Sequence, residues 1–257
     1  FWYDVSCPPT NAVESLIQRL MPLISQNDIV GAEWWVHTRL SGRNLGHQLH
    51  FDTEEETTRR TGHIVHPVIS SVCYLVGLGA GATFVLDQTV DGPPAQRGWL
   101  ARPVPNGFLT FPGDRLHGVM PARPSGAVGA PATQRLTLMI GWWNVDVVAN
   151  APRRLLGPCG PLPHCTRQCS WPSTLACTPE EVIRCQQEAY DPKPHDVQEV
   201  SPVWEHVPQA NVKATPELVV SQNIDQRFFI QGTKKFKEWL LESYTEEPKG
   251  GKRRRAC

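Results

Sequence analysis

The sequence predicts a mainly β protein, a sandwich or barrel built from short strands. Between residues 32 and 143, short apolar or alternating runs are separated by Gly, Pro, Asn and Asp, and no helix of four turns fits easily between them. Proline makes up 24 of the 257 residues, nearly twice the usual share of about 5%, which favours strands and loops over a helical bundle. Hydrophobic residues make up 40% of the chain, enough to build a core.

The first element is a helix expected over residues 11–26. Thr10 or Asn11 is a suitable N-cap, and Pro22 is expected to kink or end the helix. Its apolar side chains recur on one face at Val13, Leu16, Ile17, Leu20, Leu23 and Ile24.

Residues 67–86 form an uncharged run of 20 residues, which is long enough to span a membrane. The run contains Gly77, Gly79 and Gly81 in close order, is rich in Val and Ile, and has no basic flank. These features favour two buried strands joined at a Gly-rich turn, and no membrane span is expected.

The chain is expected to divide into residues 1–150, which hold the β core and the N-terminal helix, and residues 151–257, a Cys/Pro-rich and helical extension that packs on the core. In this extension, a helix start is expected at residues 178–181 and a last helix over residues 233–244, before the basic end KRRR. Zinc binding, disulfides and free thiols all stay open for the cluster of Cys159, His164, Cys165, Cys169, Cys177 and Cys185.

The charge balance argues against a nucleic-acid substrate. The chain has 25 basic and 25 acidic side chains, and only its end is basic. It begins at Phe1 rather than Met, so we expect a fragment or a mature chain, and the absence of a targeting segment carries no information. The compartment stays open, with the cytoplasm slightly favoured.

The strongest chemical signal is GHQLHFDTEEE, residues 46–56. On a strand, His50 and Asp52 point to the same face, where an imidazole and a carboxylate supply two ligands for a divalent metal. A distal histidine would complete a facial triad, and His117, at a predicted strand entry, is the candidate. The alternative ligands, each expected to be a surface or capping histidine, are His37, His47, His63 and His66; on a strand, His47 would face away from His50.

Four segments follow one another in an order that resembles the one found in the 2-oxoglutarate- and Fe(II)-dependent dioxygenases. The resemblance is strongest to the prolyl 4-hydroxylase-like branch of that family. The segments are HFD, GLGAGATFVLDQ, PVPNGFLTFPGDRLHGVMP and QRLTLMIGWW, and the match covers roughly residues 30–145. The resemblance implies a double-stranded β-helix, a jelly-roll or cupin-like barrel with flanking helices and an irregular Cys/Pro-rich C-terminal extension.

The resemblance also implies residue roles. His50, Asp52 and His117 would bind Fe(II), Arg135 would anchor the far carboxylate of 2-oxoglutarate, and Tyr74 could hydrogen-bond the same carboxylate or be a core residue. An arginine suits this task because its planar fork of donors matches a carboxylate. Arg135 follows His117 by 18 positions, a wider spacing than is usual in the family, so three other arginines stay in competition: Arg102, Arg115 and Arg123.

The function that the resemblance implies is hydroxylation of an unactivated C–H bond, most of all in a peptidyl or free amino-acid side chain, with release of succinate and CO2. Ascorbate is a candidate reductant, and O2 is the further cosubstrate. Asp52 supplies a carboxylate ligand, which favours hydroxylation over halogenation. The alternatives are an oxygenase acting on a small natural product, a non-catalytic cupin-like metal- or ligand-binding module, and a zinc-dependent interaction domain.

Five tryptophans are expected near the barrel, and one or two of them are expected to form part of the wall of the substrate pocket. They are Trp34, Trp35, Trp99, Trp142 and Trp143.

Overall fold

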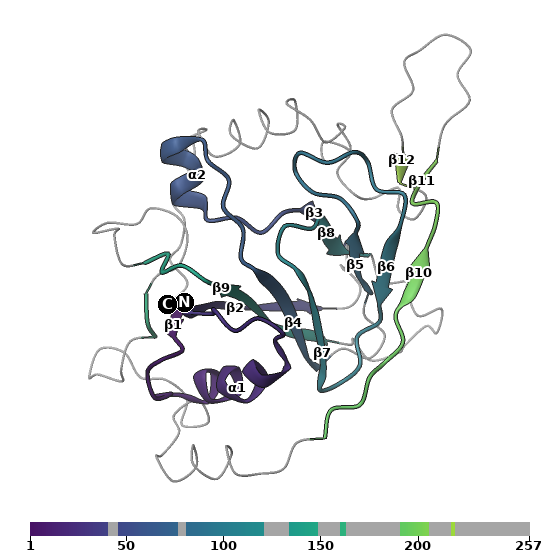
Figure 1. Ribbon diagram of the computed structural model, residues 1–257. Coiled ribbons are helices and arrows are strands. Elements are labelled where there is room, and N and C mark those ends of the chain that lie inside the picture. Colours follow the sequence, from purple (N-terminus) through teal and green to yellow (C-terminus); the bar gives the residue numbers. More distant parts are fainter. Residues whose placement is uncertain are drawn as a thin grey trace.

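The computed structural model describes residues 1–40, 46–76, 81–120, 134–148, 160–162, 191–205 and 217–218, and these residues form two five-stranded antiparallel sheets with two short helices (Figure 1). The first sheet has the strand order β1-β2-β9-β4-β7 and consists of β1 (Trp2–Asp4), β2 (Gly31–Leu40), β9 (Gln134–Trp143), β4 (Ile69–Val76) and β7 (Gly107–Pro112). The second has the order β10-β6-β5-β8-β3 and consists of β10 (Gln198–Val200), β6 (Gly98–Ala101), β5 (Thr83–Leu86), β8 (His117–Val119) and β3 (His47–His50). A separate pair joins β11 (Trp204–Glu205) to β12 (Glu217–Leu218).

The two sheets pack face to face. Between them lies a cluster that joins Val72 and Tyr74 of β4 to Val85 of β5 and Phe111 of β7. The Phe111 ring also contacts His117 of β8, with ring centroids 4.7 Å apart. A mainly β fold of two packed antiparallel sheets is therefore confirmed, while the finer topology of a double-stranded β-helix stays a prediction.

The predicted N-terminal helix is present as α1 (Ala12–Leu20), followed by the single 3-10 turn η1 (Met21–Leu23). The Asn11 side chain caps it by accepting hydrogen bonds from the backbone N–H groups of Val13 and Glu14, both at 3.0 Å. Pro22 lies in the 3-10 turn, where its missing N–H costs nothing and the α-helix ends. The apolar face of α1 covers the outer face of the first sheet, through Ile17 and Leu20 against Trp34, Leu138, Ile140 and Trp142.

The uncharged run of residues 67–86 contains two strands, as predicted. β4 and β5 are both largely buried, and they belong to different sheets, so the chain crosses from one layer to the other between them. The glycines at 77–80 lie outside the described residues. No helix among the residues described is long and apolar enough to cross a membrane.

One helix was not predicted, α2 (Glu55–Thr61). Its sequence, EETTRRT, has no apolar face, so hydrophobic periodicity gives no signal there. Charge stabilises it instead: acidic residues occupy the first turn and basic residues the last, Glu54 caps the N-terminus, and Gly62 ends the helix at φ 70°.

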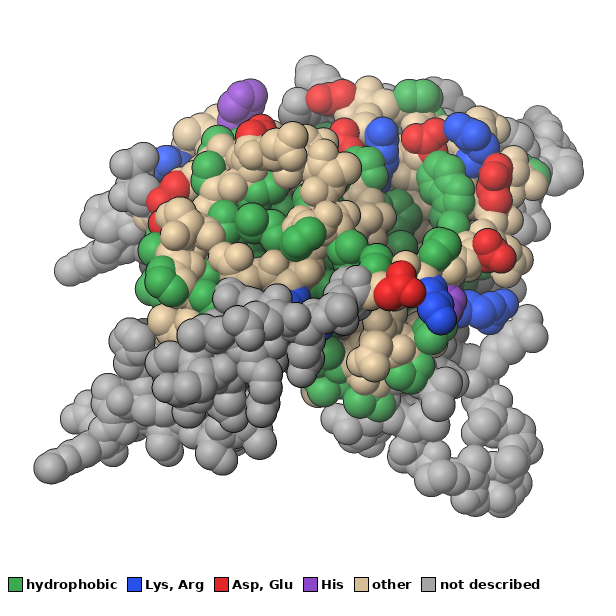
Figure 2. Space-filling model, turned by 60° about the horizontal axis from the view of Figure 1, so that its bottom comes forward, with side chains coloured by type: hydrophobic (Ala, Val, Ile, Leu, Met, Phe, Trp, Pro, Cys, Tyr) green, Lys and Arg blue, Asp and Glu red, His purple; other side chains and the backbone are tan. Residues whose placement is uncertain are grey.

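On the face shown in Figure 2, acidic and basic side chains are interspersed along one side, and hydrophobic side chains are mixed with polar ones. The exposed large hydrophobic residues are mostly valines, such as Val36, Val76 and Val145. The predicted Cys cluster, the helices expected at 178–181 and 233–244, and the basic end all lie outside the described residues.

Candidate metal centre

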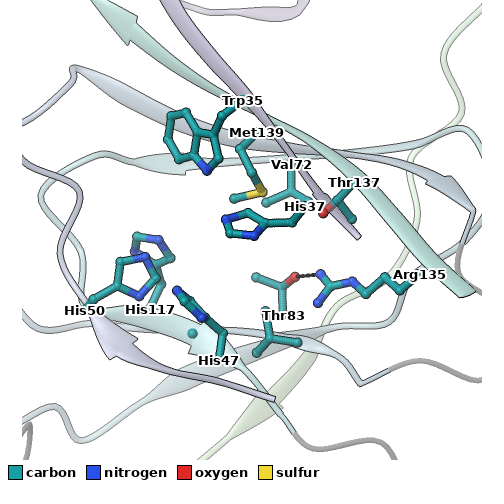
Figure 3. A pocket seen from close by; sticks show the side chains of 12 residues that line it. Trp35, His37, His47, His50, Val72, Thr83, His117, Arg135, Thr137 and Met139 are labelled. Atoms are coloured by element: carbon teal, nitrogen blue, oxygen red, sulfur yellow. Dashed lines mark hydrogen bonds between the residues drawn. The ribbon is translucent and has the colours of Figure 1, made fainter. Parts of the chain in front are cut away.

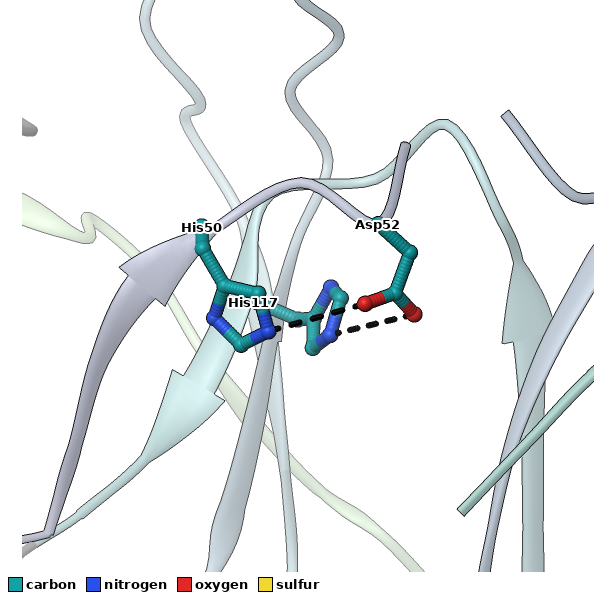
Figure 4. A group of neighbouring side chains, drawn as sticks. All are labelled: His50, Asp52 and His117. Atoms are coloured by element: carbon teal, nitrogen blue, oxygen red, sulfur yellow. Dashed lines mark ion pairs between the residues drawn. The ribbon is translucent and has the colours of Figure 1, made fainter. Parts of the chain in front are cut away.

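His50, Asp52 and His117, here called the metal triad, lie together at one end of the second sheet. His50 is the last residue of β3 and pairs directly with His117, the first residue of β8. Asp52 Oδ1 lies 3.6 Å from His50 Nε2, and Asp52 Oδ2 lies 3.6 Å from His117 Nε2 (Figure 4). One ligand atom from each residue lies within 4.8 Å of the other two, so the triad could hold a metal ion.

Both imidazoles are oriented for binding a metal through Nε2. His50 Nδ1 lies 2.9 Å from the backbone oxygen of Gln48, and His117 Nδ1 lies 2.9 Å from that of Arg115. A carbonyl only accepts, so each Nδ1 carries the proton and each Nε2 keeps its lone pair. His117 is 2% exposed, and its Nε2 has no hydrogen-bond partner among the described residues, as expected for an atom whose partner is a metal ion.

The charges of the triad also suit a divalent cation. Burial lowers the pKa of His117 to about 4, against a smaller opposing effect of Asp52, so this imidazole is neutral at neutral pH. Burial acts to raise the pKa of Asp52, but His117, His50 and a hydrogen bond from Ser70 outweigh it and hold the pKa below its usual range. A neutral imidazole and an ionised carboxylate are the forms that bind metals.

His50 and Asp52 lie close together, as predicted, but the predicted reason, alternation of side chains along one strand, is wrong. β3 ends at His50, so Asp52 lies beyond the strand and is not placed by strand alternation. Two other contacts hold it: the Ser70 hydroxyl donates to Asp52 Oδ2 at 2.6 Å, and His66 Nδ1 lies 2.7 Å from the Asp52 backbone oxygen.

A pocket extends from the triad between the two sheets, with about 420 Å³ of empty space that includes some open to solvent. His50 and His117 lie at one end and Arg135 at the other (Figure 3). Its wall includes the apolar side chains Trp35, Val72, Val119 and Met139, the polar side chains His37, His47, Thr83 and Thr137, and Gly118. Of the tryptophans proposed for a pocket wall, Trp35 lines this one.

Arg135 lies on the inner face of β9 with Thr137 and Met139 and is only 4% exposed. Its Nη2 donates to Thr83 Oγ1 at 3.2 Å, and the same oxygen accepts a hydrogen bond of 2.6 Å from the Tyr74 hydroxyl. Tyr74 is buried behind Thr83, and its ring centroid lies 5.6 Å from Arg135 Cζ. Tyr74 therefore supports the Arg135 end of the pocket through Thr83.

The competing arginines lie elsewhere. Arg102 is exposed and bonds to Gln198, Arg115 forms ion pairs with Asp87 and Asp114, and Arg123 lies outside the described residues.

His37 and His47 line the pocket, which the sequence did not predict. An irregularity sets two residues of β3, Gln48 and Leu49, against one residue of β8, Gly118, so His47 turns to the same side as His50. The His47 ring lies 4.7 Å from the His50 ring and 5.6 Å from the His37 ring, measured between centroids. The prediction that His47 faces away from His50, which assumed strict alternation along β3, is therefore wrong. His63 is exposed, as expected.

Comparison of the chain with protein-family models, with curated proteins and with solved structures finds no match. What the protein does must therefore be inferred from the residues of the site.

Proposed function

We propose that the protein is an Fe(II)- and 2-oxoglutarate-dependent oxygenase, and that its two packed sheets form a double-stranded β-helix. It would hydroxylate an unactivated C–H bond, most of all in a peptidyl or free amino-acid side chain, and release succinate and CO2. The observation that carries the proposal is the metal triad. Two histidines and one carboxylate that leave coordination positions open are the donor set of non-haem Fe(II) oxygenases.

His50, Asp52 and His117 fit Fe(II), because they offer two imidazole Nε2 lone pairs and one ionised carboxylate. When bound, iron supplies the oxygen-activating redox chemistry that amino-acid side chains lack. The protein's own contribution is to orient the ligands and limit the access of water.

The far end of the pocket supports a dicarboxylate cosubstrate. Arg135 is buried there among apolar and small polar side chains, and its guanidinium can grip a carboxylate with two parallel hydrogen bonds. Thr83 and Tyr74 hold the guanidinium in place through the hydrogen bonds at Thr83 Oγ1. Val72, Met139 and Trp35 supply an apolar wall along the pocket, which strengthens polar contacts inside it.

The test is an anaerobic titration with Fe(II) and 2-oxoglutarate, in which a visible metal-to-ligand charge-transfer band reports chelation. The band is expected for the unmodified protein and is expected to be lost in His117→Ala. Arg135→Gln should retain iron and weaken 2-oxoglutarate binding at least tenfold, since the charged fork is removed. Arg97→Gln, which removes an exposed arginine paired with Asp87, is the matched control and should bind like the unmodified protein.

Admission of O2 should then give succinate in proportion to the 2-oxoglutarate consumed. Iron bound at the triad without a band, or a band without succinate, would overturn the oxygenase proposal and favour the non-catalytic metal- or ligand-binding module.

A further inference from the structure

Asp52 lies two residues beyond the end of β3, so its position depends on contacts with other parts of the chain. Its backbone is held by His66, whose Nδ1 lies 2.7 Å from the Asp52 carbonyl oxygen. Its carboxylate is held by Ser70, which lies on β4 of the first sheet, whereas His50 and His117 lie on the second sheet. The opposite sheet therefore fixes the carboxylate of the triad.

The Ser70 contact makes the two carboxylate oxygens unequal. Ser70 is 2% exposed, and its hydroxyl donates to Asp52 Oδ2 at 2.6 Å, the length of a strong bond to an ionised acceptor. Asp52 Oδ1 lies 3.6 Å from His50 Nε2 and Oδ2 lies 3.6 Å from His117 Nε2, so the Ser70 hydrogen bond is what distinguishes the two oxygens. An oxygen that already accepts a short hydrogen bond is the poorer metal ligand of the pair.

We propose that Ser70 is a positioning residue of the metal centre, which holds Asp52 Oδ2 so that the carboxylate presents Oδ1 alone to the metal ion. Because this role presupposes a metal ion at the triad, it rests on the proposed function. Binding through one oxygen leaves an additional coordination position for an exogenous ligand. Without the Ser70 hydroxyl, the carboxylate would be free to turn and to bind through both oxygens.

Ser71, the next residue of β4, provides a matched control. It is 1% exposed, and its hydroxyl donates to the Ile140 backbone oxygen at 3.0 Å and accepts from Trp142 Nε1 at 2.9 Å. These partners belong to β9 in the first sheet, and Ser71 points to the opposite face of β4 from Ser70. Ser71→Ala thus removes an equally buried hydroxyl without touching the triad.

The experiment is a titration of the full chain with Co(II), a spectroscopic probe whose visible absorption weakens as its coordination number rises. Ser70→Ala is expected to bind Co(II) about 10–100-fold more weakly, the usual effect of losing a group that supports a metal ligand. Its absorption should also fall, because the freed carboxylate binds through both oxygens. Ser71→Ala should show the affinity and spectrum of the unmodified protein, and Ser70→Thr, which keeps a hydroxyl, should restore both.

Circular dichroism checks that each variant is folded. Unchanged Co(II) affinity and spectrum in Ser70→Ala, or an equal loss in Ser71→Ala, would overturn the role of Ser70. Co(II) binding that survives His117→Ala would overturn both this role and the metal triad itself. If Co(II) binds through the triad and responds to Ser70→Ala, but Fe(II) and 2-oxoglutarate give no charge-transfer band, then the oxygenase proposal alone fails.

Discussion

Glu33 is a partly buried carboxyl group on β2, on the strand face that by alternation also carries Trp35 and His37. Burial raises its pKa to about 7 from the usual 4.5, against a smaller opposing effect of the N-terminal ammonium, and the carboxylates of Asp52, Glu54 and Glu55 act in the same direction as burial. Between these two pH values the folded protein binds more protons than the unfolded chain. The contribution of Glu33 to the free energy of unfolding should therefore decrease as the pH rises from about 4.5 to about 7 and stay at the lower value above it, while His117, whose pKa is lowered to about 4, contributes in the opposite direction.

Glu33→Gln is expected to remove this contribution, so that the slope of the unfolding free energy against pH becomes more positive than in the unmodified protein. Urea denaturation at several pH values across the window, with a chelator present, measures the slope. Glu199→Gln, which changes an exposed glutamate on β10, is the control and should keep the slope of the unmodified protein. A slope that is the same in all three proteins would contradict the assignment to Glu33.

Cys7 and Cys73 are expected to differ in reactivity. Cys7 is exposed, whereas Cys73 is buried in the core between α1 and the first sheet, and burial raises the pKa of its thiol to about 11. The thiolate is the reactive form, so iodoacetamide at pH 8 should label the Cys7 peptide and leave the Cys73 peptide unlabelled. In denaturant, both should react, as peptide mass spectrometry can follow. Labelling of both at one rate in the native protein would contradict the burial of Cys73.

At this scale, the sequence identifies residues that belong to a motif and misses those that depend on three-dimensional contacts. His50, Asp52 and His117 could be named because a His-x-Asp and a distal histidine follow one another in a recognisable order. Ser70 carries no such signal, because its role comes from a contact across the two sheets. His47 was assigned to the wrong side because an irregularity of strand pairing is a property of two strands together.

Among the elements, the contact between β3 and β8 determines whether the triad forms. A Cβ added at Gly118 would lie 2.8 Å from the backbone oxygen of His47 and 3.1 Å from that of Gln48, and backbone atoms cannot rotate away. Gly118→Ala should therefore push β3 away from β8 and separate His50 from His117. We expect metal affinity to fall at least tenfold and stability to fall by about 1–3 kcal/mol, as is usual for overpacking.

Gly98→Ala is the matched control for this change. Gly98 lies on β6 of the same sheet, and an added Cβ would meet the side chains of Phe84 and Leu86 at 2.7 and 2.8 Å. This variant should lose stability as well, but it should keep the metal affinity of the unmodified protein. Thermal unfolding and Co(II) titration of both variants separate the two effects, and equal metal affinities would contradict the role of Gly118.

The elements with a clear periodic pattern were the ones that could be predicted. α1 has an apolar face, a capping asparagine and a proline at its end, and the run over residues 67–86 has the composition of buried strands. α2 was missed because it has no apolar face: charges and caps stabilise it, and the side chains that it buries, Glu56 and Thr58, are polar. The division of β4 and β5 between different sheets could not be read either, because strand pairing is decided by non-local contacts.

For the whole molecule, the pocket exists only because the two sheets face each other. Arg135, His37 and Trp35 come from the first sheet, and the two histidines of the triad come from the second. Residues far apart in sequence thus meet only in the folded chain. A metal ion that needs all three triad residues should bind the native state and not the unfolded one.

Metal binding is therefore expected to stabilise the whole fold. At a free metal concentration about 100 times Kd, the gain is about 2.7 kcal/mol, which corresponds to a rise in Tm of about 5–10 °C for a chain of this length. Differential scanning calorimetry with Co(II), and again after a chelator is added, measures the rise and its reversal. His117→Ala should unfold at the same temperature with and without metal, because one of the three ligands is gone. His63→Ala, which removes an exposed histidine outside the triad, should retain the full shift. In His117→Ala the triad lacks one of its three ligands. A shift that persists in this variant would therefore mean that the metal stabilises the protein from another site.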